Sequence, residues 1–195
     1  MIFVFLLAMT AFAQDPYKVA AKNYKLEFEN DWVRVSRVRY EPGDKTAVHD
    51  HPSLPTVYVY LTDGGEIQFG HQEFYALRRR PVKAGQIRFN RGNRETHTTE
   101  YFGDKASEYL RVEFKTEADR PAKDVQIAPE DQTPFENKML RIERCGPCKA
   151  VAAPSVLVSL KERSAQWLDA NAAMFTEGEQ VRVEVRSRPL REGLP

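Results

Sequence analysis

The sequence contains little of what marks a disulfide scaffold, a nucleic-acid-binding protein or a disordered chain. Only two of its 195 residues are cysteine, so the fold must depend on buried apolar surface rather than on disulfides. Its 29 basic and 28 acidic side chains give a formal charge of +1, which argues against the basic face of a nucleic-acid-binding protein. With 42% hydrophobic residues, the chain can form one domain or two small ones.

Long apolar runs are confined to the first 13 residues, MIFVFLLAMTAFA. This run is shorter than the ~20 residues that a membrane-spanning helix needs. Ala11 and Ala13 form the small-x-small pattern that precedes a signal-peptidase cut, although the usual basic residues before the apolar run are missing. We therefore expect residues 1–13 to be a secretory signal, with a buried N-terminal strand as the alternative. The mature protein is expected to be periplasmic or secreted, without a membrane contact.

Helix signals are scarce as well, and the best of them covers residues 164–175. Short β-rich segments separated by turn residues are typical of a sandwich or barrel. These segments are residues 32–40, 56–61, 66–70, 73–78, 86–90 and 108–114. The apolar residues change phase within residues 32–40, which predicts a β-bulge there. The sequence therefore predicts an all-β fold.

The chain also resembles itself. Three blocks recur in the same order: residues 28–30 as 135–137, 55–61 as 154–160, and 110–115 as 181–186. This predicts a duplicated β unit, with copies at residues 14–115 and 135–195 and a linker at 116–134. The second copy is shorter between its first two blocks, in the segment that carries histidines in the first copy.

All four histidines of the sequence lie in the first copy. His49 and His51 are one residue apart, so a strand would place both rings on the same face. Imidazoles at this spacing suit one divalent metal ion, and His97 is the expected third ligand from a distant strand. The alternative is a pocket without metal. His71 follows Gly70 at an expected hairpin tip, where solvent exposure is predicted.

Two motifs around these histidines resemble those of the cupins. The first comprises Gly43, His49, His51 and Gly64, and the second comprises Gly85, Gly92, Thr96 and His97. The resemblance covers residues 24–115. It implies a jelly-roll barrel, or double-stranded β-helix, in which the three histidines bind a divalent metal. It also makes the duplicated chain a bicupin-like protein with a degenerate C-terminal half.

The sequence departs from the cupin motifs at three places. The first motif has no carboxylate where the family usually carries a glutamate ligand. In the second motif, Glu95 stands at the usual histidine position and His97 follows two residues later, so Glu95 is a rival ligand. We favour His97 because Thr-His-Thr-x-Glu resembles a common variant of this motif. Tyr101 replaces the usual asparagine and is expected at the pocket mouth.

Strand alternation extends the expected pocket beyond the metal ligands. If His49 faces the interior, Val57 and Val59 are expected to share that interior. Tyr58 and Tyr60 would then point outward, toward the second copy or toward a second subunit of a homodimer. Ordinary packing between sheets is the alternative for the two tyrosines.

The only two cysteines lie in the motif Cys145-Gly-Pro-Cys148, which is similar to the active-site loop of thioredoxins. A thioredoxin needs a helix directly after this loop, but here a β-rich run begins within a few residues. In an exported protein we therefore expect a short-range disulfide, and a thiol oxidoreductase is the less favoured function.

These patterns together predict an exported cupin that depends on iron, zinc, manganese or nickel. The expected activity is oxygenase-like or isomerase-like, on a small organic molecule. The alternative is a non-catalytic module that binds a metal or a small ligand.

Overall fold

The computed structural model describes residues 14–71, 75–116, 123–172 and 177–187. Over these ranges the chain consists of antiparallel strands and one short helix, α1 (Pro16–Val19), which confirms the all-β prediction. Residues 1–13, the expected signal, lie outside the described residues. The part of the chain that the structure describes contains no helix with the length and hydropathy of a membrane span.

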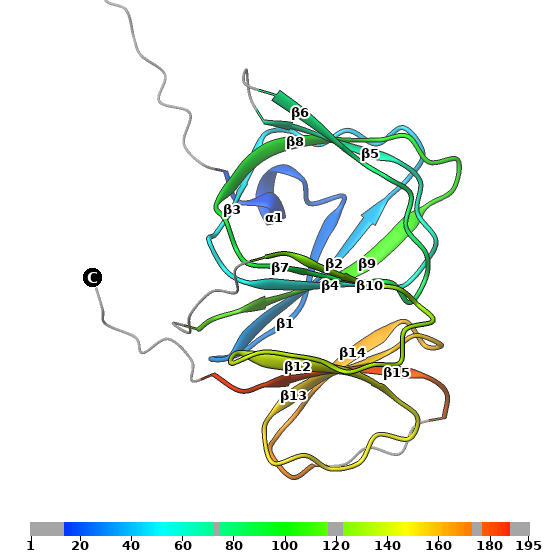
Figure 1. Cartoon of the computed structure of the whole chain (residues 1–195). Helices are drawn as coiled ribbons and strands as arrows, with labels where there is room; N and C mark the ends of the chain where they lie inside the picture. The colour runs from blue at the N-terminus through cyan, green and yellow to red at the C-terminus, as the bar shows by residue number, and fades with distance from the viewer. Residues whose placement is uncertain (1–13, 72–74, 117–122, 173–176, 188–195) are drawn as a thin grey trace, which may run out of the picture.

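Two antiparallel sheets form a barrel in the first half of the chain (Figure 1). The six-stranded sheet has the order β1-β2-β9-β4-β7-β10 and comprises β1 (Tyr24–Glu29), β2 (Val33–Tyr40), β4 (Thr56–Tyr60), β7 (Ile87–Asn90), β9 (Ser107–Phe114) and β10 (Val125–Ile127). The four-stranded sheet has the order β3-β8-β5-β6 and comprises β3 (His49–His51), β5 (Ile67–His71), β6 (Tyr75–Arg79) and β8 (Glu95–Tyr101).

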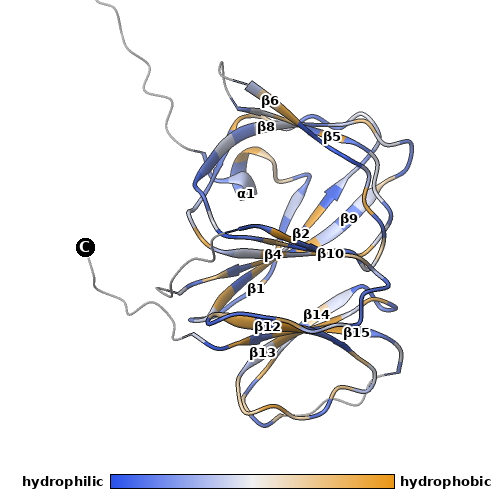
Figure 2. Cartoon of the chain, in the orientation of Figure 1, coloured by the Kyte–Doolittle hydropathy of each residue, from blue (hydrophilic) through white to orange (hydrophobic). Residues whose placement is uncertain are grey.

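The second half contributes one five-stranded sheet, ordered β11-β12-β15-β13-β14. Its strands are β11 (Phe135–Glu136), β12 (Leu140–Cys145), β13 (Ser155–Ser159), β14 (Ser164–Leu168) and β15 (Gln180–Val185). This sheet packs against the outer face of the six-stranded sheet, and Figure 2 shows apolar residues along both layers. Valine, leucine, isoleucine and phenylalanine side chains from both halves form one shared core between the two layers.

The two packed sheets have matching connectivity. The order β1-β2-β9-β4-β7 corresponds to β11-β12-β15-β13-β14, and the recurring sequence blocks lie at corresponding strands. Asn30 accepts hydrogen bonds from the backbone N–H groups of the second and third residues after it, and Asn137 does the same. Within the described part of residues 135–187, no strands correspond to the four-stranded sheet that completes the first barrel.

The structure reverses the predicted orientation of β4. Val57 and Val59 face the second half and belong to the shared core, whereas Tyr58 and Tyr60 face the barrel interior. The prediction was wrong because β4 is buried on both faces, so its alternation has no polar side that would identify the interior. The tyrosines therefore provide no outer surface for a second subunit.

Two other local predictions are wrong. The expected bulge in residues 32–40 is absent, since β2 pairs with β9 without a register shift; the irregularity lies in β1, between Leu26 and Phe28. The phase change in β2 arises because both of its faces are buried. Val33 and Val35 face the second half, whereas Val38 and Tyr40 face the barrel interior. The helix expected at residues 164–175 is strand β14, paired with β13, and residues 173–176 lie outside the described part.

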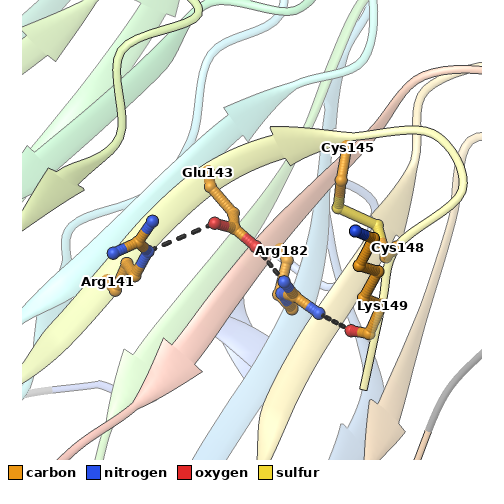
Figure 3. Close-up of a disulfide and its surroundings, with 6 residues drawn as sticks. All are labelled: Arg141, Glu143, Cys145, Cys148, Lys149 and Arg182. Carbon is orange, nitrogen blue, oxygen red and sulfur yellow. Dashed lines mark hydrogen bonds and ion pairs between the residues drawn. A yellow bond between two sulfur atoms is a disulfide. The ribbon is translucent and has the colours of Figure 1, made fainter. Parts of the chain in front are cut away.

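Cys145 and Cys148 are joined by a disulfide at the end of β12 (Figure 3). The chain continues from this turn into strand β13 and not into a helix, as the thioredoxin arrangement would require. Beside the turn, the buried Arg182 donates hydrogen bonds to the Lys149 carbonyl and to Glu143. The disulfide turn thus helps to cover the face of the second sheet that points away from the first half.

Candidate metal centre

Three histidines meet inside the barrel because β3 and β8 are neighbouring antiparallel strands. His49 lies directly opposite His97, and His51 lies opposite Glu95. His49 and His51 share a face because successive side chains on a strand alternate. The ring centroids are 4.9 Å apart for His49 and His51, 4.8 Å for His49 and His97, and 5.1 Å for His51 and His97.

The chemistry of these three side chains fits a metal ion. One ring nitrogen from each histidine can be chosen so that all three lie within 4.8 Å of one another. The side chains are buried, with 0% to 2% of each residue exposed. Both ring nitrogens of His97 and Nε2 of His51 have no hydrogen-bond partner. Buried polar atoms without partners cost free energy, and imidazole nitrogens are good ligands for divalent transition metals.

A hydrogen bond holds His49 in the tautomer whose Nε2 carries a lone pair. Its Nδ1 lies 2.9 Å from the carbonyl oxygen of Ala47, which can only accept, so Nδ1 carries the proton. The lone pair is therefore on Nε2, which lies 3.3 Å from the hydroxyl of Tyr24. A backbone carbonyl that fixes the orientation of a histidine in this way is typical of metal ligands.

The surroundings keep all three imidazoles neutral. Burial is the main cause that lowers the pKa of His49 and His51, and it lowers the pKa of His97 to about 2. The nearby cation of Arg111 acts in the same direction on each ring. Neutral imidazole is the form that binds metal, so no proton has to leave at pH 7.

A pocket of about 550 Å³ reaches the histidine cluster from the side of α1 and β3. It is lined by His51 together with Tyr24, Arg34, Arg94, Arg111 and Glu113, among others. Arg111 and Glu113 are both buried and form an ion pair at 3.0 Å. Sequence reasoning did not identify Tyr24 or Arg111, because neither lies in a histidine motif and both reach the pocket from strands β1 and β9 of the other sheet.

No protein-family model matches this chain, and no curated protein matches it. A solved structure from Pseudomonas aeruginosa, named as glyoxylate induced, is 9% identical, with 88% of this chain and 82% of that chain covered and a TM-score of 0.57. A cupin domain from Bordetella pertussis Tohama I is 21% identical, covering 47% of this chain and 91% of that domain, with a TM-score of 0.41. Vicilin from Capsicum annuum is 8% identical, and the match covers 80% of this chain and 76% of vicilin, with a TM-score of 0.44.

The chain shares the fold of the Pseudomonas aeruginosa structure. Its two antiparallel sheets close into the barrel that the resemblance to cupins implies. The resemblance seen in the two histidine motifs is thus confirmed at the level of the fold. The cupin barrel is the first half of the chain, and its interior holds all three histidines of the cluster.

Glu95, the rival ligand, lies beside the histidine cluster. It shares the inward face of β8 with His97, and its Oε2 is 3.7 Å from Nδ1 of His97. Its side chain is 21% exposed, and it does not belong to the group whose ligand atoms converge. This position suits a carboxylate that orients His97 from the second coordination sphere.

Tyr101 lies deeper in the cupin barrel than expected. It is buried, and its hydroxyl accepts a hydrogen bond from the Gly65 N–H and donates one to the Lys105 carbonyl. It lines a narrow cavity of about 30 Å³ with Tyr40 and Tyr58, and it is not among the residues of the pocket that reaches His51. Tyr101 therefore does not lie at the mouth of the pocket that reaches His51, where the sequence analysis expected it.

His71 is half-buried, and its ring lies near the histidine cluster, a contact that the sequence analysis did not predict. It is the last residue of β5 and pairs with Tyr75, so it does stand at the end of a hairpin. Its ring stacks on Tyr75 at 4.5 Å and lies 5.6 Å from the ring of His97. The sequence contained no sign of this contact, because it depends on the pairing of β5 with β8.

Proposed function

We propose that this chain is an exported cupin enzyme that binds one divalent metal ion through His49, His51 and His97. The observation that carries the proposal is the convergence of three buried imidazoles, several of whose nitrogens have no other partner. The ion would supply Lewis-acid chemistry or an oxygen-binding centre for an oxygenase-like or isomerase-like reaction. Iron, zinc, manganese and nickel are all compatible with a set of three imidazoles.

The pocket beside the cluster supports action on a small organic molecule. Three protein ligands leave coordination positions open, as in catalytic rather than structural sites. The volume of about 550 Å³ is in the range of pockets for small molecules. His51 belongs both to the cluster and to the pocket wall, so a molecule in the pocket would reach the ion.

The charges of the pocket favour one alternative, a module that binds without turnover. Arg94 is paired with Asp50, and Arg111 is paired with Glu113. These ionic groups are therefore engaged with one another, and neither carboxylate is a free general base. Such a module would hold the metal and a small ligand but convert no substrate.

The first test is the metal content of protein purified without chelator and without nickel affinity resin. We expect about one equivalent in the wild type and less than a tenth of that in His49→Ala, His51→Ala and His97→Ala. His71→Ala is the matched control, because it removes the fourth histidine from the same barrel, and it should retain the metal. Full metal content in His97→Ala would disprove the ligand assignment.

The same measurement separates the two roles of Glu95. As an orienting carboxylate, Glu95→Gln should keep a stoichiometric ion with affinity reduced about 10- to 100-fold. Loss of the metal to the level of His97→Ala would instead make Glu95 a ligand.

A second assay decides between enzyme and binding module. Oxygen consumption and isomerisation of small organic acids, alcohols and sugars should be measured with the metal-loaded protein. Turnover that disappears in His49→Ala supports the enzyme, whereas ligand binding without turnover supports the module. Export is tested separately, since cleavage after Ala13 predicts a mature chain that begins at Gln14.

A further inference from the structure

Tyr24 contacts the histidine cluster and also lines the pocket beside it. It is 4% exposed, and its ring lies 5.3 Å from the ring of His49 and 5.7 Å from that of His51. It also lines the pocket that reaches His51. Its hydroxyl is 3.3 Å from Nε2 of His49 and 3.2 Å from the hydroxyl of Tyr40. No sequence motif identified this residue.

The hydrogen bond between Tyr24 and His49 has a definite direction, because Nδ1 of His49 donates to the Ala47 carbonyl and Nε2 must therefore accept. When Tyr24 donates to Nε2, its oxygen is left to accept from Tyr40, whose own oxygen accepts from Thr99 at 3.4 Å. Without a metal, the Tyr24 hydroxyl therefore occupies the lone pair that the ion would use.

Metal binding would take this acceptor away from Tyr24. A buried hydroxyl without an acceptor is costly. The Tyr40 hydroxyl already accepts from Thr99, and it could replace His49 as the acceptor for Tyr24 only if its own proton were donated to another partner. The Tyr24 hydroxyl points at the nitrogen that would hold the ion, so an atom in an open position of the ion is its natural new partner.

The charge of the site indicates which ligand this would be. Three neutral imidazoles contribute no charge to balance the double positive charge of the ion, and the single carboxylate of Glu95 beside His97 would balance only half of it. The buried cation of Arg111 adds no net negative charge, because Glu113 only balances it. A small anion with an oxygen donor would both reduce this charge and accept a hydrogen bond.

We propose that Tyr24 donates a hydrogen bond to an anionic oxygen ligand, such as the carboxylate of a small organic acid, bound at the open position of the metal. This proposal rests on the proposed metal site and specifies the class of molecule that the site takes. Tyr24 would select for oxygen anions by supplying a donor that is free only when the ion is present.

The test uses the full chain loaded with Co²⁺, whose visible absorption reports its ligands. Acetate is titrated into wild type, Tyr24→Phe and Tyr60→Phe, and the spectral change gives the acetate affinity. Tyr24→Phe keeps the ring but removes the donor, so we expect acetate to bind about tenfold more weakly. Co²⁺ itself should bind as tightly as to the wild type, or more tightly, because the competing hydrogen bond to His49 is gone.

Tyr60→Phe is the matched control. It removes another buried hydroxyl from the same barrel, and Tyr60 packs against Tyr109. This variant should bind acetate with wild-type affinity, which would exclude a general effect of removing a tyrosine hydroxyl.

Four outcomes would overturn the proposal, and they differ in whether the proposed metal site would remain. An acetate affinity in Tyr24→Phe within twofold of the wild type, or an equal loss in Tyr60→Phe, would remove the role of Tyr24. A wild type that binds Co²⁺ but shows no response to acetate would remove the anion preference, and the metal site would remain. A wild type that binds no Co²⁺ would overturn both this proposal and the proposed function.

Discussion

His49 and His97 lie directly opposite each other on β3 and β8, with ring centroids 4.8 Å apart. The pairing depends on β3, a strand of only three residues. Asp50, between the two histidines of this strand, accepts hydrogen bonds from Thr96 at 2.8 Å and from Arg94 at 2.7 Å. These bonds lie on the opposite face from the histidines and tie β3 to β8. Hydrogen bonds on the outer face of the barrel therefore help to fix the register between β3 and β8, which places the histidines opposite one another.

Replacing Asp50 by alanine should weaken metal binding without removing a ligand. Loss of its bonds to Thr96 and Arg94 would let β3 shift relative to β8, and misplaced ligands bind less tightly. We expect the metal affinity to fall about 10-fold, measured by competition with a chelating dye. Asp63→Ala is the control, since Asp63 is paired with Lys83 in an exposed loop. Equal effects in both variants would contradict the role of Asp50.

The metal-free protein should lose stability in mild acid. Burial lowers the pKa of His49, His51 and His97 in the folded state, whereas in the unfolded chain these groups titrate near 6.5. Below that pH the unfolded state binds protons that the folded state does not. The histidine contribution is therefore fully present above about pH 6.5 and is lost as the pH falls below it, by about 1.4 kcal/mol per pH unit for each neutral ring.

Urea unfolding of chelator-treated protein at pH 7.5, 6.5 and 5.5 measures this loss. For His51 and His97, whose pKa values lie farthest below 6.5, we expect a decrease of about 2 to 3 kcal/mol between pH 7.5 and 5.5, and His49 adds to it in the same direction. Carboxylates titrate mainly below this window, so the change belongs to the histidines. A variant with all three histidines replaced by glutamine should show a much flatter profile. An equally steep profile in that variant would contradict the explanation.

The histidine site shows which features of the sequence were sufficient for prediction. His49 and His51 could be assigned to one face because the side-chain period of a strand is two, and the pairing of β3 with β8 places His97 opposite His49. The repeated blocks were also recognisable, because Asn30 and Asn137 make the same turn in both halves. These features depend on local spacing and on local hydrogen bonds.

The features that could not be predicted depend on which layer covers each face. In β4, valines and tyrosines alternate and all five residues are buried, so the pattern does not tell which set faces the histidines. Tyr24, Arg111 and the position of His71 follow from that choice and from strand pairings that no local pattern specifies. The predicted boundaries at residues 115 and 135 remain predictions, since the two halves share one core.

Arg111 and Glu113 should stabilise the fold only as a pair. Arg111 donates to Glu113 at 3.0 Å and to the Tyr58 hydroxyl at 3.2 Å, and both charged side chains are buried. Arg111→Met leaves the carboxylate of Glu113 buried, with Arg34 more distant at 3.9 Å. We expect this variant to lose about 3 to 5 kcal/mol of unfolding free energy.

The double variant Arg111→Met/Glu113→Gln tests whether that loss comes from the unpaired charge. Removing both charges should recover at least half of the lost stability, because the remaining side chains need no buried counter-ion. Urea unfolding of the wild type, both single variants and the double variant gives the coupling energy. Additive losses in the double variant would show that the pair makes no such contribution.

The two halves should unfold together, since their sheets enclose one core. Leu140 of β12 is fully buried in this core. The ring centroid of Trp32, in the first half, lies 6.5 Å from that of Trp167 on β14. Because these are the only tryptophans, their fluorescence reports on the contact between the halves.

Leu140→Ala should lower the free energy of unfolding by about 2 to 5 kcal/mol. Metal release from the first half should shift to lower urea together with the fluorescence change. Leu26→Ala, at a residue that is 51% exposed, should shift neither transition. If Leu140→Ala moved the fluorescence transition and left metal release unchanged, the first barrel would be stable without the second sheet, and the shared core would not couple the halves.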